Sequence, residues 1–120
     1  MTHKLTEKQF KSFESEVEYW LEYFGILDWQ VLVLFEKIDD ARGDCTFNIP
    51  GKIATIRLSK EWNYPPKGFD VEKCAFHEVC ELLLCQLTVF SNFFIKDSIV
   101  EEQTHYIIRT LENTIFKEKS

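Results

Sequence analysis

The segment from Cys74 to Leu87 constrains the fold of this chain more than any other. It reads CAFHEVCELLLCQL, and its length and apolar content are typical of a helix that is buried on most of its sides. Three ionisable side chains, His77, Glu78 and Glu81, nevertheless lie within two turns of it. Because His77 and Glu81 are four residues apart, they project from the same face of the helix. Ionised groups in an apolar element are costly unless something pairs with them, and a bound cation would do so.

The residues before this segment predict a helix followed by a small sheet. Phe10, Phe13, Val17, Trp20, Leu21 and Phe24 recur at helical spacing, which predicts a helix over residues 6–24. Thr6 and Gln9 have the spacing of a capping box, and Gly25 supplies the stop. The period then changes to that of strands, and short turns separate the apolar runs. We expect strands at 29–37, 43–49 and 52–59, paired as an antiparallel meander.

The C-terminal half predicts two helices. Asp70 is suited to cap the central helix, which we expect to end near Thr88. A second helix is expected from Ser98 to Phe116, with an apolar stripe facing inward. The whole chain, residues 1–120, then forms one α+β domain: an N-terminal helix, a three-stranded antiparallel sheet and two C-terminal helices that carry the site.

Charge and composition narrow the classes of partner. The net charge is −6, and no run of Lys or Arg is present, so binding to nucleic acid is disfavoured. No apolar run has the length of a membrane span, and the N-terminus is too polar for a signal peptide. Three of the four cysteines share one predicted helix, which favours reduced, buried thiols. We therefore expect a cytoplasmic protein without a membrane partner.

The central helix has the spacing of a metal site. Ligands at positions i and i+4 can reach one ion, so His77 and Glu81 are candidate ligands and Glu78 is a candidate general base. A zinc-bound water is acidic enough to lose a proton near neutral pH, and an adjacent carboxylate can accept that proton. The alternative is that His77 is a satisfied core histidine and that the two glutamates reach solvent. Cys74 and Cys80 flank His77, and a thiolate ligand is a further alternative to plain packing.

The last helix offers additional ligands. Glu101 and His105 form another i, i+4 pair, and both are candidate ligands. Ser98 and Glu101 also have the spacing of a capping box, which would occupy the Glu101 side chain. In that case Glu102 becomes the substitute ligand. His105 could instead orient a ligand without binding the ion.

This pattern resembles the HExxH zinc metallopeptidases, in the form where a glutamate from a following helix completes the site. It is most similar to small metallopeptidases encoded by bacteriophages, and more distantly to SprT-like domains. The resemblance rests on His77-Glu78-Val79-Cys80-Glu81 and on Glu101-Glu102-Gln103-Thr104-His105, and it covers most of the chain from Trp29 onward. It implies a zincin-like fold in which the strand Ile53–Leu58 is the edge strand that lines the substrate cleft.

The resemblance also implies residue roles. His77 would be the first ligand, Glu78 the general base and Glu101 a further ligand, with His105 beside them. The sequence departs from the motif at Glu81, where the family has its second histidine. A His/Glu/Glu set with His105 would still hold a divalent ion; zinc is expected, with manganese or iron as alternatives because carboxylates are harder ligands.

Two functions follow from these observations. One is a metal-dependent hydrolase, a phage metallopeptidase-like protein that acts on a protein or peptide in the host cytoplasm. The alternative is a catalytically inactive zincin-like protein that binds a host protein, for which Trp62 and Tyr64 would provide an exposed apolar surface. A third function, a nucleic-acid-associated metalloprotein, conflicts with the acidic composition.

Overall fold

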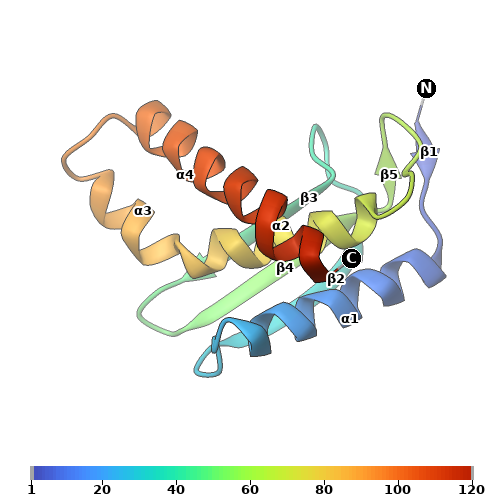
Figure 1. Cartoon of the computed structure of the whole chain (residues 1–120), viewed down its shortest axis with the longest axis horizontal. Coiled ribbons are helices and arrows are strands. Elements are labelled where there is room, and N and C mark those ends of the chain that lie inside the picture. Colours follow the sequence, from blue (N-terminus) through green and yellow to red (C-terminus); the bar gives the residue numbers. More distant parts are fainter. Residues whose placement is uncertain (1, 120) are drawn as a thin grey trace.

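The structure is a computed structural model that describes residues 2–119, and it confirms the α+β class (Figure 1). One two-stranded pair, β1 with β5, and a three-stranded sheet are combined with a helical layer. The elements are β1 (His3–Lys4), α1 (Glu7–Tyr23), β2 (Gln30–Glu36), β3 (Gly43–Asn48), β4 (Ile53–Ser59), β5 (Glu61–Trp62), α2 (Asp70–Leu83), α3 (Cys85–Ser91), α4 (Asp97–Leu111), the π-helical turn η1 (Glu112–Phe116) and α5 (Lys117–Lys119).

Helix α1 begins and ends as its sequence predicts. The Thr6 hydroxyl accepts a hydrogen bond from the Gln9 backbone N–H at 3.1 Å, and Gln9 Oε1 accepts one from the Thr6 N–H at 2.8 Å. This capping box satisfies two backbone donors at the N-terminus. After the helix, Gly25 has a φ of +71°, a left-handed conformation that glycine adopts without strain. The predicted limits of this helix are therefore confirmed within one residue.

The three-stranded sheet is not the predicted antiparallel meander. Its order is β2-β4-β3, and β2 runs parallel to β4 whereas β3 is antiparallel to it. The most buried strand takes the centre, because Ala54, Ile56 and Leu58 of β4 are each almost fully buried. The edge strand beside the site is β3, so the expectation that Ile53–Leu58 is an edge strand is also wrong. A two-residue pair, β1 with β5, was not predicted.

Helices α1 and α2 cover one face of this sheet, and the core lies between them. Phe13, Val17 and Trp20 of α1 meet Phe76 and Val79 of α2 over the inward side chains of β4. Trp20 and Phe76 pack edge to face, with ring centroids 4.6 Å apart. The opposite face of the sheet is polar at its centre.

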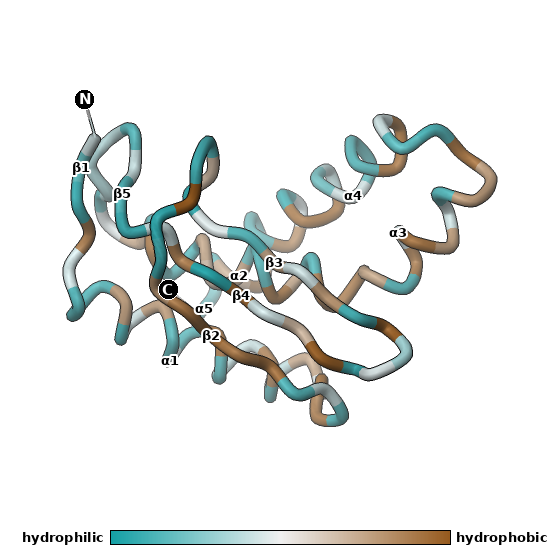
Figure 2. The backbone as a smooth tube through the Cα atoms, turned by 180° about the vertical axis from the view of Figure 1, so that it is seen from behind, coloured by the Kyte–Doolittle hydropathy of each residue, from teal (hydrophilic) through white to brown (hydrophobic). Residues whose placement is uncertain are grey.

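On that opposite face, one arginine bridges the two outer strands. Arg57 of β4 forms ion pairs with Asp44 of β3 and, at 3.2 Å, with Glu36 of β2. In the tube view from behind, β4 carries teal segments and lies next to β2, which is mostly brown (Figure 2). The site described below is formed by residues of α2 and α4 and lies on the helical side of the sheet.

The central helix is shorter than predicted. It ends at Leu83, and α3 continues from Cys85 after a bend of 54°. The Asp70 side chain does not cap the helix; Phe69 is the N-cap residue, and Asp70 accepts a hydrogen bond from the Lys67 N–H at 2.9 Å. The bend turns α3 towards α4, and the two helices form a hairpin at one end of the molecule (Figure 1).

Helix α4 returns from this hairpin across α2 (Figure 1). It begins at Asp97, and Lys96 is its N-cap residue. At Glu112 the helix changes to the wider π-helical turn η1, so the predicted single helix to Phe116 is interrupted at its end. Among residues 2–119 no single helix has the length and hydropathy to cross a membrane; α2 and α3 meet that test only together, across their bend.

Candidate metal site on helices α2 and α4

Helix α2 presents its ionisable side chains beside its apolar face. Ala75, Phe76 and Val79 are fully buried in the core and fix the rotation of the helix. His77 and Glu81 then lie at the border of the buried face, with side chains 31% and 28% exposed. Nε2 of His77 and Oε1 of Glu81 are 3.5 Å apart, which is the contact that the i, i+4 spacing predicts.

Helix α4 adds a second histidine to this pair. His105 Nε2 lies 3.2 Å from Oε1 of Glu81, the same oxygen that faces His77. The two imidazole rings are 5.5 Å apart between centroids. One ligand atom from each of His77, Glu81 and His105 lies within 4.8 Å of the others, and this is the one such group of three or more among residues 2–119. The structure therefore brings three of the four predicted ligands together.

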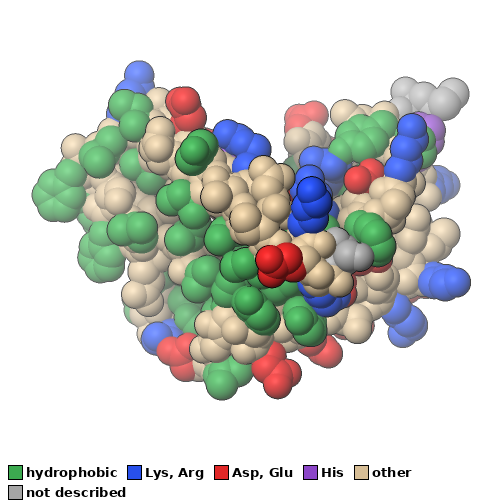
Figure 3. Space-filling model, viewed as in Figure 1, with side chains coloured by type: hydrophobic (Ala, Val, Ile, Leu, Met, Phe, Trp, Pro, Cys, Tyr) green, Lys and Arg blue, Asp and Glu red, His purple; other side chains and the backbone are tan. Residues whose placement is uncertain are grey.

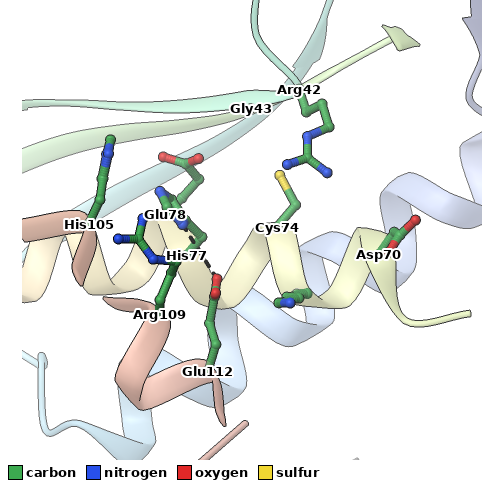
Figure 4. A pocket seen from close by; sticks show the side chains of 10 residues that line it. Arg42, Gly43, Asp70, Cys74, His77, Glu78, His105, Arg109 and Glu112 are labelled. Atoms are coloured by element: carbon green, nitrogen blue, oxygen red, sulfur yellow. Dashed lines mark ion pairs between the residues drawn. The ribbon is translucent and has the colours of Figure 1, made fainter. Parts of the chain in front are cut away.

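Glu112, which had no role in the site predicted from the sequence, contacts the second ring nitrogen of His77. Oε2 of Glu112, in η1, lies 3.5 Å from Nδ1 of His77 (dashed line in Figure 4). The Glu112 side chain is only 10% exposed. Its signal in the sequence was the seven-residue interval from His105, which places both residues on one helix face two turns apart. The two nitrogens of the His77 ring thus face two different carboxylates.

These contacts determine the charge of His77 and Glu81. Burial would lower the pKa of His77, but hydrogen bonds with Glu112 and Glu81 and the charge of Glu78 outweigh it and raise the pKa to about 10. The hydrogen bond with His77 lowers the pKa of Glu81 against the opposing effect of burial, and His105 adds to this lowering. Without a metal, a proton on His77 therefore takes the position between the carboxylates that a cation would take.

Glu78 lies deeper than its neighbours. It is 7% exposed, and no hydrogen bond or ion pair joins its carboxylate to another of the residues that the structure describes. Burial raises the pKa of Glu78 to about 7, and the charge of His77 opposes this rise. Its carboxylate lines the pocket described next, so it retains access to solvent. A carboxylate with this pKa can accept a proton near neutral pH.

A pocket of about 410 Å³ opens beside these residues. His77, Glu78, His105 and Glu112 line it together with three cationic side chains, Arg42, Lys73 and Arg109 (Figure 4).

The start of β3 forms the opposite wall of this pocket. A Cβ placed on Gly43 would lie 2.8 Å from Cys74 Sγ and 3.6 Å from Glu78 Oε2. The absence of a side chain at Gly43 thus allows the strand to approach α2 directly above Glu78.

The remaining predicted ligands lie elsewhere. Glu101 and Glu102 are exposed on α4 and are not part of the His77–Glu81–His105 group. The Ser98–Glu101 capping box is also absent, because α4 has no side-chain cap. The ligand role of Glu101, which came from the resemblance, is therefore not supported by its position. Cys80 is buried, and burial raises the pKa of its thiol to about 12, which suits packing and not metal binding.

The converging atoms are two imidazole nitrogens and one carboxylate oxygen. This set can hold a divalent ion and leave positions open for solvent. All four cysteines are free, as predicted, and none joins the group.

No family model, curated protein or solved structure matches the chain. The site geometry therefore carries the functional argument alone.

Proposed function

We propose that the protein is a metal-dependent hydrolase of the metallopeptidase type, with a divalent ion held by His77, Glu81 and His105. The observation that carries the proposal is the orientation of the His77 ring. Its Nε2 faces Glu81 at 3.5 Å, while its Nδ1 faces Glu112 at 3.5 Å. Metal-binding histidines usually donate their second ring N–H to a carboxylate, which fixes the ring and increases its basicity.

The donor set favours zinc. Two histidines and one glutamate are the ligands of several catalytic zinc sites. With His105 and not Glu101 as the third ligand, the site holds one carboxylate, so the preference for harder ions is weaker than the sequence suggested. Manganese and iron remain alternatives, because two histidines and one carboxylate also bind non-haem iron.

Glu78 is the catalytic base in this proposal. A divalent ion in the site would acidify a water molecule and polarise the carbonyl group of a substrate. The Glu78 carboxylate lines the same pocket. It would accept a proton from the water as the water oxygen attacks the peptide carbonyl carbon, and it would pass that proton to the amine nitrogen as the C–N bond breaks. Glu112 holds the His77 ring, and the pocket admits the substrate. A peptide in the host cytoplasm is the proposed substrate class.

The test combines metal content with peptide hydrolysis. Native mass spectrometry of the purified chain should show one divalent ion, and His77→Ala should lose it. Glu78→Gln should retain the ion but lose hydrolysis of a mixed peptide library. Wild-type protein that neither contains nor takes up a transition metal would refute the proposal. Equal hydrolysis by wild type and Glu78→Gln would remove the role of Glu78.

A second candidate, a non-catalytic binding protein, is favoured by the apolar surface of the α3–α4 hairpin. Phe93 and Phe94 are 74% and 88% exposed there. Of the two residues expected from the sequence to form an exposed apolar surface, Trp62 is buried, so that expectation is wrong for it, whereas Tyr64 is 40% exposed and contacts Arg42. For a binding protein, Glu78→Gln would leave the biological effect of the protein unchanged, whereas substitution of Phe94 would abolish it.

A further inference from the structure

The pocket beside the proposed metal site carries three cationic side chains, although the chain as a whole is acidic. The whole chain has 14 Lys and Arg against 20 Asp and Glu. The pocket, in contrast, is lined by as many Lys and Arg side chains (Arg42, Lys73 and Arg109) as carboxyl groups (Asp70, Glu78 and Glu112). One of those carboxylates, Glu112, is paired with His77. The pocket therefore has a higher proportion of cationic side chains than the chain as a whole, which suits an anionic ligand.

The two arginines have no carboxylate partner. No ion pair joins Arg42 or Arg109 to an acidic residue among residues 2–119, whereas Arg57 forms two such pairs on the other side of the sheet. An arginine side chain presents several donors in a planar arrangement that matches carboxylate and phosphate groups. The donors of Arg109, and those of Arg42 that do not bond to Tyr64, are thus available to a ligand in the pocket.

Aromatic contacts fix the position of Arg42. Its guanidinium carbon lies 5.5 Å from the Trp62 ring centroid and 5.2 Å from that of Tyr64, and Nη1 donates to the Tyr64 hydroxyl. The Trp62 indole N–H donates to the Arg42 carbonyl at 3.2 Å, which holds the backbone as well. In Figure 4 the guanidinium points into the pocket towards Cys74. A cation that is already oriented loses less conformational entropy when it binds a ligand.

Arg109 approaches from the opposite side. It lies one helical turn after His105 and one before Glu112, on the face of α4 that meets the site. Figure 4 shows its guanidinium beside His77, with Arg42 across the pocket. The two arginines therefore bracket the space next to the proposed metal.

We infer that this pocket binds an anionic group of the substrate, a carboxylate or a phosphate, between Arg42 and Arg109. The inference rests on the proposed function for the neighbouring metal, but the arginines bind the anion independently of the metal. The substrate would then be an acidic molecule, such as a peptide with an acidic residue or a free carboxyl terminus next to the bond that is cleaved.

Calorimetric titration tests the inference on the full chain, first metal-free after dialysis against a chelator. Succinate and inorganic phosphate are the two probes, at constant ionic strength, and the tighter one identifies the chemistry of the anion. Arg42→Gln and Arg109→Gln should each weaken binding about tenfold. Lys11→Gln, an exposed cation on α1, is the matched control and should have no effect.

Two results would overturn the inference: no binding of either probe, or equal weakening by Lys11→Gln. Zinc content is measured on the same variants. If zinc is retained and anions do not bind, the metal site stands and the anion site is wrong. If zinc never binds but succinate or phosphate does, the proposed hydrolase is wrong and the anion site stands.

A second inference concerns the α3–α4 hairpin and rests on different observations. No charged residue lies between Glu81 and Lys96 in a chain in which 28% of residues are charged. Phe90, Phe93 and Phe94 are 61%, 74% and 88% exposed in this segment. Figure 2 shows the hairpin as a brown end of the tube, and Figure 3 shows green side chains gathered over the same end.

A groove lies next to these phenylalanines. It measures about 140 Å³ and runs between α3 and α4, lined by apolar side chains that include Leu87, Ile99 and Ile107. Two residues of its lining, Ser91 and Ile95, are the sequence neighbours of Phe90 and Phe94, and exposed rings are complementary to an apolar groove. A two-fold axis through this face would place the phenylalanines of each copy in the groove of the other.

The exposed area is sufficient for such a contact. With about 200 Å² for each aromatic side chain, the three phenylalanines alone expose about 450 Å². A stable interface buries about 800 Å² on each partner, and the exposed leucine and isoleucines around the groove supply a large part of the rest. Because this face carries no charged side chain, two acidic copies could meet there without bringing like charges into contact.

We propose that the α3–α4 hairpin is the interface of a homodimer. Sedimentation velocity of the full chain at micromolar concentrations should show a dimer. Phe94→Glu should give a monomer with an unchanged melting temperature, since the side chain is exposed. Leu27→Glu, at an apolar residue 76% exposed before β2, is the control and should remain dimeric.

A wild-type monomer at these concentrations would overturn this proposal, and so would a Phe94→Glu dimer. Co-flotation of a wild-type monomer with phosphatidylcholine vesicles would assign the hairpin to a lipid surface instead of a second copy.

Discussion

Oε2 of Glu112 lies 3.5 Å from Nδ1 of His77, and this contact holds the imidazole ring with its other nitrogen towards Glu81 and His105. The contact joins the C-terminal end of the α4 segment to the middle of α2. In the proposed metal site, this contact would fix the ring before an ion binds, which a chance cluster of polar side chains would not do.

Glu112→Gln should therefore weaken zinc binding by about 10- to 100-fold without removing a ligand. The neutral amide is a weaker acceptor for the Nδ1 proton, so the ring becomes less basic and less fixed. Competition against a fluorescent zinc chelator measures the change. Glu102→Gln, on the exposed face of α4, is the control. Equal affinities for wild type and Glu112→Gln would show that His77 is not a ligand held in this way.

The resemblance and the geometry differ in the ligand that they assign to α4. Glu81→Gln should abolish zinc binding, because Glu81 Oε1 lies 3.5 Å and 3.2 Å from the two imidazole nitrogens. Glu101→Gln should retain wild-type affinity, because Glu101 is exposed outside the group. The same chelator competition measures both variants. Loss of zinc from Glu101→Gln would restore the ligand set that the motif suggested.

These two residues illustrate which parts of the site the sequence could predict. The His77–Glu81 pair depends only on the local geometry of one helix, so four-residue spacing was sufficient. The choice among Glu101, His105 and Glu112 depends on where α4 crosses α2. The helices run antiparallel, with His77 opposite Glu112 and Glu81 opposite His105. One turn further on, α2 has ended, and Glu101 lies on the exposed side of α4.

In the fold, too, the features set by local sequence were predicted, and those set by tertiary packing were not. The capping box of Thr6 and the left-handed Gly25 are local, and both were predicted. The order of the strands is not local: it depends on β4 having the most apolar inward face and therefore taking the centre of the sheet. The bend at Leu84 has no local signal either, because neither glycine nor proline occurs between Asp70 and Ser91. It follows from the packing of α3 against α4.

Zinc binding should release protons in an amount that depends on pH. With its pKa raised to about 10, His77 is protonated in the metal-free protein at neutral pH, and a ligand must be deprotonated. About one proton should therefore leave for each ion bound at pH 7, and affinity should increase about tenfold per pH unit. Calorimetry in buffers of different ionisation enthalpy measures this release. A binding enthalpy that is independent of the buffer would contradict it.

Glu78→Gln should stabilise the metal-free protein in a pH-dependent way. The pKa of Glu78 is raised from 4.5 to about 7 in the folded state, so the unfolded chain ionises first and stability is lost as pH rises from about 4.5 to 7. At pH 8 the buried charge costs about 3 kcal/mol, and at pH 5 about 1 kcal/mol or less. Urea unfolding should therefore show that Glu78→Gln increases the free energy of unfolding more at pH 8 than at pH 5. A gain of the same size at both would indicate that the carboxyl group is not buried.

Gly43→Ala should destabilise the fold by about 1–3 kcal/mol, because the new methyl group would lie 2.8 Å from Cys74 Sγ and 2.9 Å from the Arg57 carbonyl oxygen. The sulfur can be removed, whereas the backbone oxygen cannot. Gly43→Ala combined with Cys74→Ala should therefore recover part of the loss, and Cys74→Ala alone measures the cost of the missing sulfur. Thermal unfolding of the three variants gives the coupling between the two positions. Additive losses would show that β3 moves away from α2 to accept the methyl group, and the pocket above Glu78 would widen with it.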